Sequence, residues 1–281
     1  MTTKKDVLDA LRSTSRTFYI PIARLPGGLQ EAIASAYLCM RSIDEIEDHP
    51  ALDNPTKARL LQRVSLLLQA QTSPETFARD EFASLFDSLG GVLPEVTIRI
   101  GEWACHAPAS IAPRIWDAVA AMADRMAYWA STGWKIQTLA DLDRYTFSVA
   151  GAVGLLLCDV WVWYDGANLN RTHAIHFGRG LQLVNILRNR EEDLHRGVDF
   201  FPTGWTIREM HEYARRNLSL AEAYARSLPH GPFYYMIQIP LVLAKATLDA
   251  LAIGKRKLSR ARVLQLVRQA ERDSFRPSVA R

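Results

Sequence analysis

Helical spacing of apolar residues runs through almost the whole chain, and it restricts the possible folds more than any other feature. From Leu29 onwards, apolar residues recur at intervals of three and four, which places them on one face of an α-helix. Alternation of β-branched residues over four or more positions, which would indicate strands, is hard to find. The chain is therefore expected to be all-α. Helices are predicted from Leu29 to near His49 and over 56–71, 75–88, 94–106, 112–131, 139–163, 171–195, 205–226, 232–252 and 259–274.

Length and composition favour one globular domain. The 281 residues, 48% of them hydrophobic, can bury a large core, and no long linker divides them, so a single helical bundle over residues 1–281 is expected. The longest apolar run, VAGAVGLLLCDVWVWY, contains Asp159, and the first residues lack the apolar core of a signal peptide. These features predict a cytoplasmic protein. The net charge of +4 suits an anionic small substrate and is too small to indicate nucleic-acid binding.

An acidic cluster, Asp44-Glu45-Ile46-Glu47-Asp48, ends the helix that begins at Leu29. Asp44 follows Tyr37 by seven positions and Met40 by four, so it shares their core-facing side. A carboxylate there must be paired, protonated or bound to a metal, because an isolated buried charge is too costly. Asp48 follows one turn later, and two carboxylates a turn apart suit Mg²⁺. Taken alone, the run is more typical of an exposed acidic helix end than of a metal site.

A second polar stripe lies in LQLVNILRNREED (181–193). Asn185, Asn189 and Asp193 are spaced by four, which places three oxygen-bearing side chains on one helix face. Amide and carboxylate oxygens can bind Mg²⁺, and Arg188 in the same helix would place a permanent cation beside a bound phosphate. A solvated helix face is the alternative. The two clusters together indicate a site for a metal ion and a diphosphate.

Four segments resemble the squalene and phytoene synthase family in order and spacing. YLCMRSIDEIED (37–48) and LQLVNILRNREEDLHRGVDFFP (181–202) resemble its two aspartate-rich motifs. STSRTFYIPIARLP (13–26) is similar to its opening segment, and YTFSVAGAVG (145–154) to its Tyr…Val-Ala-Gly-x-Val-Gly helix. The resemblance implies a class I isoprenoid (terpenoid) synthase fold, a helical bundle around a central cavity. It also implies two or three Mg²⁺ ions and the head-to-head coupling of two farnesyl diphosphates to presqualene diphosphate or squalene.

The resemblance also assigns roles to individual residues. The implied catalytic residues are Asp44, Asp48, Tyr145, Arg188 and Asp193. The implied metal ligands are Asp44, Asp48, Asn185, Asn189 and Asp193. The implied substrate-binding residues are Ser15, Arg16, Thr17, Phe18, Tyr37, Arg41, Val149, Gly151, Gln182 and Asn185. NADPH would be needed for reduction to squalene, and the chain carries no Gly-rich dinucleotide fingerprint.

Two departures from the family pattern keep other functions open. Asn189 stands where the family usually has Asp, and an amide adds no negative charge to hold a metal. Val198 stands where the family commonly has Arg. The stripe Asn185, Asn189, Asp193 is similar to the Asn, Ser, Glu triad of terpene cyclases. One alternative is therefore a single-substrate terpene cyclase or prenyl diphosphate hydrolase that releases a C15 product. Another is a catalytically silent isoprenoid-binding protein.

Two further features have more than one interpretation. The small residues of SVAGAVG would either leave room for an isoprenoid chain or allow close helix packing, and the neighbouring motifs favour the cavity. The basic stretch GKRKLSRAR (254–262) is most simply a solvated face. It could also close the phosphate site through Lys257 or Arg260, or make a transient contact with an anionic membrane surface during product release.

Overall fold

The computed structural model describes residues 2–89 and 91–275, and within these ranges it contains helices and no strand. The expected all-α class is confirmed. The helices form two compact units, the first comprising the chain up to Trp134 with Asp159–Gly166, the second comprising Lys135–Cys158 with the chain from Ala167 onwards. One domain over residues 1–281 stays a prediction beside this division.

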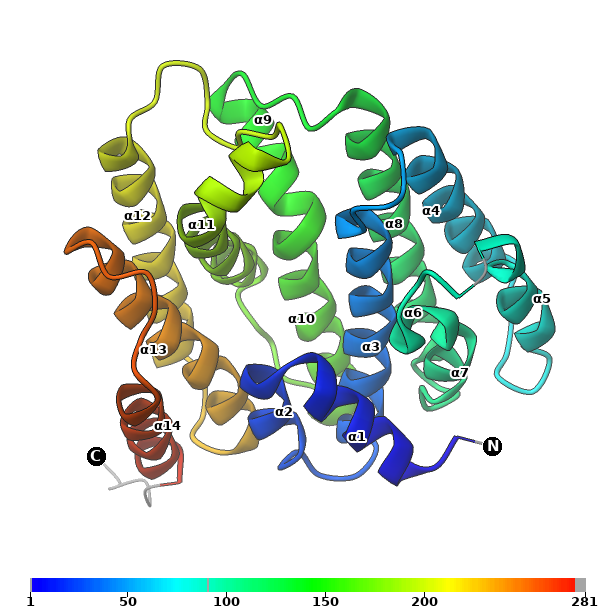
Figure 1. Cartoon of the computed structure of the whole chain (residues 1–281). Helices are drawn as coiled ribbons and strands as arrows, with labels where there is room; N and C mark the ends of the chain where they lie inside the picture. The colour runs from blue at the N-terminus through cyan, green and yellow to red at the C-terminus, as the bar shows by residue number, and fades with distance from the viewer. Residues whose placement is uncertain (1, 90, 276–281) are drawn as a thin grey trace. The chain divides into compact units, whose positions relative to one another are not determined.

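The first unit is built around α3, which packs against α8 and the short helix α7. α8 also packs closely along α4 (Figure 1). The helices of this unit are α1 (Lys4–Thr14), α2 (Arg16–Ile22), α3 (Leu29–Asp48), α4 (Asn54–Gln69), α5 (Arg79–Ser84), the 3₁₀ turn η1 (Asp87–Leu89), α6 (Glu95–Ile98), α7 (Ile100–Cys105) and α8 (Ala112–Thr132).

Helix α3 is anchored along nearly its whole length. It starts after Gly28, whose φ of 77° is open to glycine at little cost, and it stops one residue before the His49-Pro50 step. Its buried Ser42 hydroxyl lies 2.8 Å from its own helix's Leu38 carbonyl and 2.7 Å from the Val96 carbonyl. The buried Trp103 indole donates to the same Val96 carbonyl at 2.8 Å. These bonds fix the end of α3 that carries the acidic cluster.

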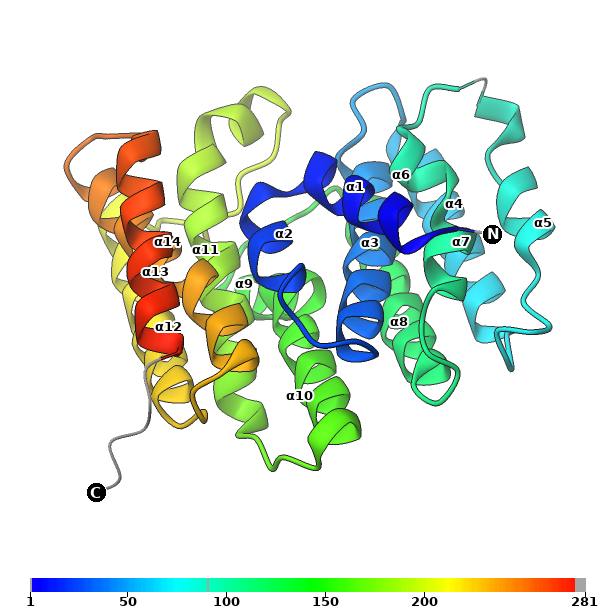
Figure 2. The ribbon, with the colours of Figure 1, turned by 90° about the horizontal axis from the view of Figure 1, so that it is seen from below.

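The second unit is centred on α11, which packs against α12 and against the η2 segment. α14 lies beside α13 in both ribbon views (Figures 1 and 2). The elements of this unit are α9 (Leu139–Thr146), η2 (Phe147–Gly151), most of α10 (Ala152–Asp165), α11 (Arg171–His195), α12 (Ile207–Arg226), α13 (Pro232–Ala252) and α14 (Arg260–Ser274).

A π-helical turn, η2, interrupts the helix that runs from Leu139 to Asp165. This helix and α11 each carry a glycine where their backbones touch, Gly154 just after η2 and Gly178 in α11. A Cβ atom on Gly154 would lie 2.1 Å from the Ala174 carbonyl oxygen, and one on Gly178 would lie 2.1 Å from the Ala150 carbonyl oxygen. Close packing therefore accounts for Gly154, and the expectation that it lines a cavity is corrected because α11 occupies that space.

Most predicted helices are found within a few residues of their expected ends, and 171–195 and 232–252 match at both ends. The predicted helix 94–106 is two short helices, α6 and α7, and 75–88 is reduced to α5 and a 3₁₀ turn. The sequence analysis missed α1 and α2. A capping box starts α1, in which the Thr3 hydroxyl accepts from the Asp6 amide while the Asp6 carboxylate accepts from the Thr3 amide. That signal was available in the sequence.

Two helical stretches, Leu139–Asp165 and Pro232–Ala252, are long and apolar enough to cross a membrane by length and composition. About half of the most apolar window in each is buried inside the protein, 44% and 50% respectively. Core helices of globular proteins meet the same criterion, so this finding is weak evidence for a membrane span.

Replacing Thr206 by Ala is expected to lower the free energy of unfolding by about 1 kcal/mol. Thr206 caps α12: its hydroxyl accepts from the Glu209 amide at 3.3 Å, and the Glu209 carboxylate accepts from the Thr206 amide at 2.7 Å. Urea unfolding of Thr206→Ala and Thr206→Ser measures the effect. The serine variant keeps the capping hydroxyl and should retain most of the stability; equal losses in both would show that the cap contributes nothing.

Candidate functional site

The acidic cluster lies in the last turn and a half of α3. Glu47 is buried and Asp48 is exposed, while 36% of the side-chain surface of Asp44 is exposed to solvent. Asp44 lies on the side of α3 expected from its spacing to the core residues. With Glu45, four carboxylates lie within five residues and repel one another, so a cation bound at this end of the helix would relieve that repulsion.

Two of these carboxyl groups hold their protons more tightly than usual. Burial raises the pKa of Asp44 to about 7; Arg41 lowers it, while Asp48 and Glu45 raise it further. Burial also raises the pKa of Glu47 to about 8, with contributions in the same direction from Asp48 and Asp44. A bound divalent cation would favour the charged form of both groups. The oxygen-only donor set fits Mg²⁺ and does not fit zinc.

Arg41 and the N-terminal segment surround the predicted substrate side of α3. The Arg41 guanidinium is paired with the Glu45 carboxylate and lies 3.9 Å from that of Asp44. The Phe18 and Tyr37 rings are 5.5 Å apart, and burial raises the pKa of Tyr37. Ser15 caps α2 by accepting from the Phe18 amide at 3.2 Å. The structure thus brings together five of the predicted side chains.

Two other predicted residues belong to the same segment. Thr17 is half-buried in the first turn of α2. Arg16 begins α2, and its side chain lies outside the described part of the chain. The roles of both residues as diphosphate contacts stay predictions.

The second polar stripe lies along the last three turns of α11. Asn185 is exposed, Asn189 is half-buried and Asp193 is buried, with only 6% of its surface exposed. Gln182 is half-buried one turn earlier, and Arg188 is exposed. The helical periodicity that predicted one shared face is confirmed, because α11 runs without interruption from Arg171 to His195.

Arginine side chains already contact two of the predicted ligand oxygens. The Arg196 guanidinium lies 2.5 Å from the Asp193 carboxylate, and the Arg188 side chain donates to the Asn189 amide oxygen at 3.1 Å. The sequence analysis missed Arg196, although its i,i+3 spacing from Asp193 is a recognised pairing distance on a helix. The negative charge of Asp193 is therefore paired with the positive charge of Arg196 near the end of α11.

The helix similar to the family's Val-Ala-Gly segment presents its predicted residues around η2. Tyr145 is buried and stacks on Phe200, with ring centroids 4.6 Å apart. Val149 is half-buried within η2. Gly151 is buried, and a Cβ there would lie 3.1 Å from the Ile175 side chain on α11. π-Turns inside helices are frequent at functional sites, and the roles of these residues toward a substrate stay predictions.

The basic stretch after α13 reaches α11 through a residue that was not singled out. Arg256 lies 2.5 Å from the Glu191 carboxylate and 3.8 Å from that of Glu192. Lys257 and Arg260, the two residues expected near the phosphate, are exposed. Loop-to-helix pairs of this kind depend on the tertiary fold and leave no mark in sequence spacing.

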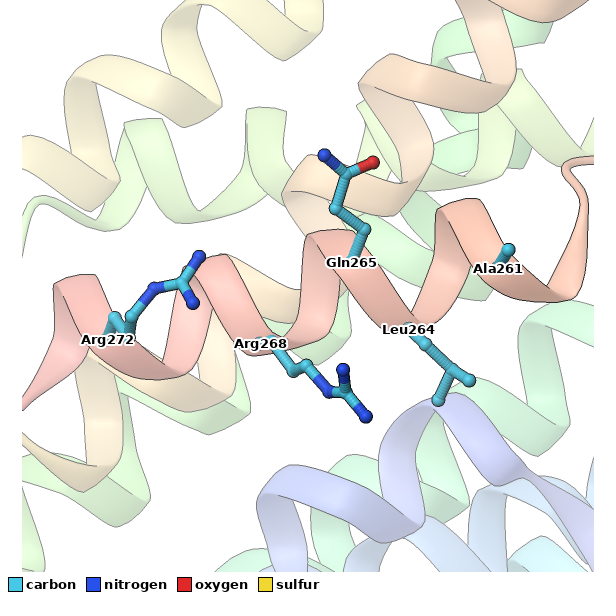
Figure 3. A pocket seen from close by; sticks show the side chains of 5 residues that line it. All are labelled: Ala261, Leu264, Gln265, Arg268 and Arg272. Atoms are coloured by element: carbon cyan, nitrogen blue, oxygen red, sulfur yellow. The ribbon is translucent and has the colours of Figure 1, made fainter.

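An open hollow lies beside α14 (Figure 3). Its lining residues are Ala261, Leu264, Gln265, Arg268 and Arg272. The picture shows them on one helix, with the guanidinium groups of Arg268 and Arg272 as its charged part. None of these residues was predicted to bind substrate. The basic face of α14 is accordingly separate in sequence from both polar clusters.

Each cluster has a distinct chemical capacity. The end of α3 offers crowded carboxylates to a cation. The end of α11 offers arginines to an anion, and amide and carboxylate oxygens to a cation. Among the residues that the structure describes, no group of three or more His, Cys, Asp and Glu side chains is arranged to hold a metal ion. Mg²⁺ commonly takes one or two carboxylates and completes its shell with water and substrate phosphates.

Comparison with known proteins gives a consistent result. The family model described as squalene/phytoene synthase matches residues 11–209, which include both clusters. A squalene synthase of Schizosaccharomyces pombe is 29% identical over 203 residues, covering 68% of this chain and 42% of that protein. A 15-cis-phytoene synthase of Enterobacter agglomerans is 34% identical over 112 residues, covering 34% of this chain and 37% of that protein. The matched segments thus cover less than half the length of each of these two relatives.

The fold is also similar to that of solved structures. A solved structure, TcSQS in complex with the ligand BPH1237, superposes with a TM-score of 0.75 at 21% identity, covering 95% of this chain and 85% of that one. The expected class I isoprenoid synthase fold is therefore confirmed. With a family model that covers residues 11–209 and includes both polar clusters, the chain belongs to the squalene/phytoene synthase family.

Proposed function

We propose that the chain is a Mg²⁺-dependent prenyltransferase that joins two farnesyl diphosphates head to head, giving presqualene diphosphate or squalene. The carboxylate cluster at the end of α3 carries this proposal, because it gathers several oxygen ligands of the kind that Mg²⁺ prefers within two turns of one helix. The family membership of the segment that contains both clusters supports it. Farnesyl diphosphate is chosen over its C20 homologue as the commoner case.

In this proposal each cluster has a separate task. Asp44 and Asp48 would hold Mg²⁺ at the end of α3, and Asn185, Asn189 and Asp193 would hold it along α11. When bound, Mg²⁺ supplies positive charge to the departing diphosphate. Arg188 and Arg41 add permanent cations that can bridge phosphate oxygens as negative charge develops on them.

Aromatic side chains would protect the allylic cation. The tilted pair Phe18 and Tyr37 lies beside the α3 cluster, and Tyr145 stacks on Phe200 in the other unit. The face of an aromatic ring stabilises a nearby cation by roughly 0.5 to 2 kcal/mol. These rings also exclude water, which would otherwise capture the cation as an alcohol.

Diphosphate release tests this proposal at the level of ionisation. The purified chain is incubated with C10, C15 and C20 prenyl diphosphates, with Mg²⁺ or with EDTA. Release that requires Mg²⁺ and is fastest with the C15 substrate is expected. Absence of release from every substrate would contradict the enzymatic proposal and favour a silent isoprenoid-binding protein.

The second candidate is a single-substrate cyclase or hydrolase. Asn189 favours it, because its amide oxygen carries no charge and is already bonded to Arg188. Val198 favours it as well, since an aliphatic side chain can neither donate a hydrogen bond to a second diphosphate nor pair with its charge. The first proposal has two further parts. The enzyme would be cytoplasmic, and its basic stretch 254–262 would make a transient contact with a membrane surface. It would also use NADPH for reduction to squalene.

Restoring the carboxylate with Asn189→Asp is expected to lower the Mg²⁺ concentration for half-maximal diphosphate release by about three- to tenfold. One added negative charge close to a cation changes the binding free energy by about 1 kcal/mol in a partly exposed site. A Mg²⁺ titration of initial rates measures the effect, with Asn185→Asp as a second variant on the same stripe. An unchanged titration for Asn189→Asp would show that residue 189 does not contact the metal.

A further inference from the structure

We propose that Asp143, Arg179 and Tyr213 are positioning residues for the reaction, because together they fix the register of the π-helical turn η2. This turn directly follows the helix that carries Tyr145, and it contains Val149. The function proposed above uses both of these side chains beside the prenyl chain, so the inference rests on that function. It adds three residues that act on the reaction through η2.

The start of η2 departs from an ordinary α-helix and needs hydrogen bonds from outside its own ladder. Amides in a π-turn reach back five residues instead of four, so carbonyls in the preceding turn lose their usual partners. The hydroxyls of Thr146 and Ser148 donate to the Leu142 and Arg144 carbonyls, each at 2.7 Å. Such hydroxyl bonds tend to bend a helix. They leave the turn dependent on contacts with neighbouring helices.

Arg179 on α11 provides the first of these contacts. Its guanidinium donates at 3.1 Å to the Asp143 backbone carbonyl, which also accepts from the Phe147 amide. Arg179 follows Gly178, where a Cβ atom would lie 2.1 Å from the Ala150 carbonyl oxygen. The glycine sets how closely α11 approaches η2, and the arginine sets which residue of α9 lies opposite it.

Tyr213 on α12 holds the side chain of the same aspartate. Its hydroxyl donates to the Asp143 carboxylate. Burial and then the Asp143 carboxylate raise the pKa of Tyr213 to about 12, so near neutral pH the phenol keeps the proton that it donates. Asp143 thus joins α9 to α11 through its backbone and to α12 through its carboxylate.

A second polar link fixes Tyr213 in place. The side-chain oxygen of the buried Asn217 lies 2.8 Å from Nδ1 of His176 on α11, and the Asn217 amide group donates to the Tyr213 carbonyl at 3.0 Å. The Trp205 ring packs edge-on against the Tyr213 ring, with centroids 5.7 Å apart. A connected network of this kind holds its members more firmly than separate pairs would.

The register of η2 determines which side chains face the substrate. A slip by one residue would turn every following side chain by about 100° around the helix. Val149 and Gly151 would then leave their present side, and Tyr145, which stacks on Phe200 at 4.6 Å, would lose its support from the following turn. A misplacement of about 1 Å near the reacting atoms can lower a rate by about 10²-fold.

The fate of the allylic cation tests this role, because a ratio of products does not depend on how much of the enzyme is folded. Farnesol formed per diphosphate released from farnesyl diphosphate is measured for the wild type, Tyr213→Phe and Arg179→Met. Both variants are expected to raise this ratio severalfold and to lower kcat about tenfold, with KM within about threefold of the wild type. An unchanged ratio together with an unchanged kcat in both variants would overturn the proposal.

Tyr224→Phe is the matched control, the same substitution on the same helix. The Tyr224 hydroxyl lies 3.8 Å from the Cys158 sulfur on α10, so this variant should keep the wild-type ratio. Asp143→Asn keeps an oxygen that can accept from Tyr213 and should retain most of the wild-type behaviour, whereas Asp143→Ala should not. Adding Tyr213→Phe to Asp143→Ala should cause no further loss, because the two groups act as one unit. Equal effects of Tyr213→Phe and Tyr224→Phe would show that the network has no specific role.

Hydrogen exchange separates this inference from the proposed function. Amides 147–152 are expected to exchange at least about tenfold faster in Tyr213→Phe and Arg179→Met than in the wild type, with those of α13 unchanged. Unchanged exchange in η2 would refute the positioning role and leave the proposed function intact. Absence of diphosphate release by the wild type with every prenyl diphosphate would refute the function, and the exchange rates would still decide whether these residues hold η2.

Discussion

Asp44→Asn is expected to lower kcat/KM for Mg²⁺-dependent diphosphate release by about 10²- to 10³-fold, the loss typical when one electrostatic contact to the developing charge is removed. The side chain keeps its size and loses the charge that would hold the cation. Burial is the main cause of the raised pKa of Asp44, and the charges of Asp48 and Glu45 raise this pKa further. Initial rates at saturating Mg²⁺ measure the effect.

The fold should survive this substitution. Because the pKa of Asp44, about 7, is raised above the usual value of 3.8, its ionised form is less favourable in the folded chain than in the unfolded one. At pH 8 without metal, a neutral amide removes this penalty, so the melting temperature should be unchanged or higher. Asp117→Asn, on an exposed position of α8 in the same unit, is the matched control and should retain full activity. Comparable losses in both variants would contradict a specific role for Asp44.

Gly178→Ala is expected to lower the free energy of unfolding by at least about 3 kcal/mol, the upper part of the range for overpacked sites. The added methyl group would lie 2.1 Å from the Ala150 carbonyl oxygen, and a backbone atom cannot rotate away as a side chain would. η2 and α11 would have to separate. Gly154→Ala should lower the free energy of unfolding by a similar amount, since its methyl group would clash with the Ala174 carbonyl oxygen on α11. Urea unfolding measures both losses.

Gly27→Ala is the matched control for these variants. Nothing lies within 4 Å of the position that its Cβ would take, and its backbone is not in the left-handed region. Its stability should stay within about 0.5 kcal/mol of the wild type. If Gly178→Ala were as stable as Gly27→Ala, the close contact of η2 with α11 would be wrong.

The sequence predicted the helical architecture because apolar spacing and glycine or proline breaks are local properties. α11 and α13 were predicted to the residue, and the end of α3 followed from the His49-Pro50 step. The π-turn η2 was not predictable in this way, since it depends on packing against α11. The same holds for α2, a seven-residue helix that contains Pro21 and is stabilised by tertiary contacts.

The candidate site was predictable as a set of residue types and was less so as a set of contacts. The spacing of Asn185, Asn189 and Asp193 determined their shared face on α11. The i,i+3 spacing of Asp193 and Arg196 allows the two side chains to pair but does not determine it, because arginine rotamers at a helix end can point in several directions. Likewise, the pairing of Arg256 with Glu191 joins residues 65 positions apart in sequence. Such pairs follow from the tertiary fold.

The most direct test of the proposed function is to identify the products formed from farnesyl diphosphate and Mg²⁺. The purified chain is incubated with and without NADPH, and extracts taken with and without phosphatase treatment are analysed by mass spectrometry. We expect C30 products, namely presqualene alcohol after phosphatase treatment, or squalene when NADPH is present. C15 hydrocarbons or farnesol in the untreated extract, without any C30 product, would contradict head-to-head coupling and assign the chain to single-substrate chemistry.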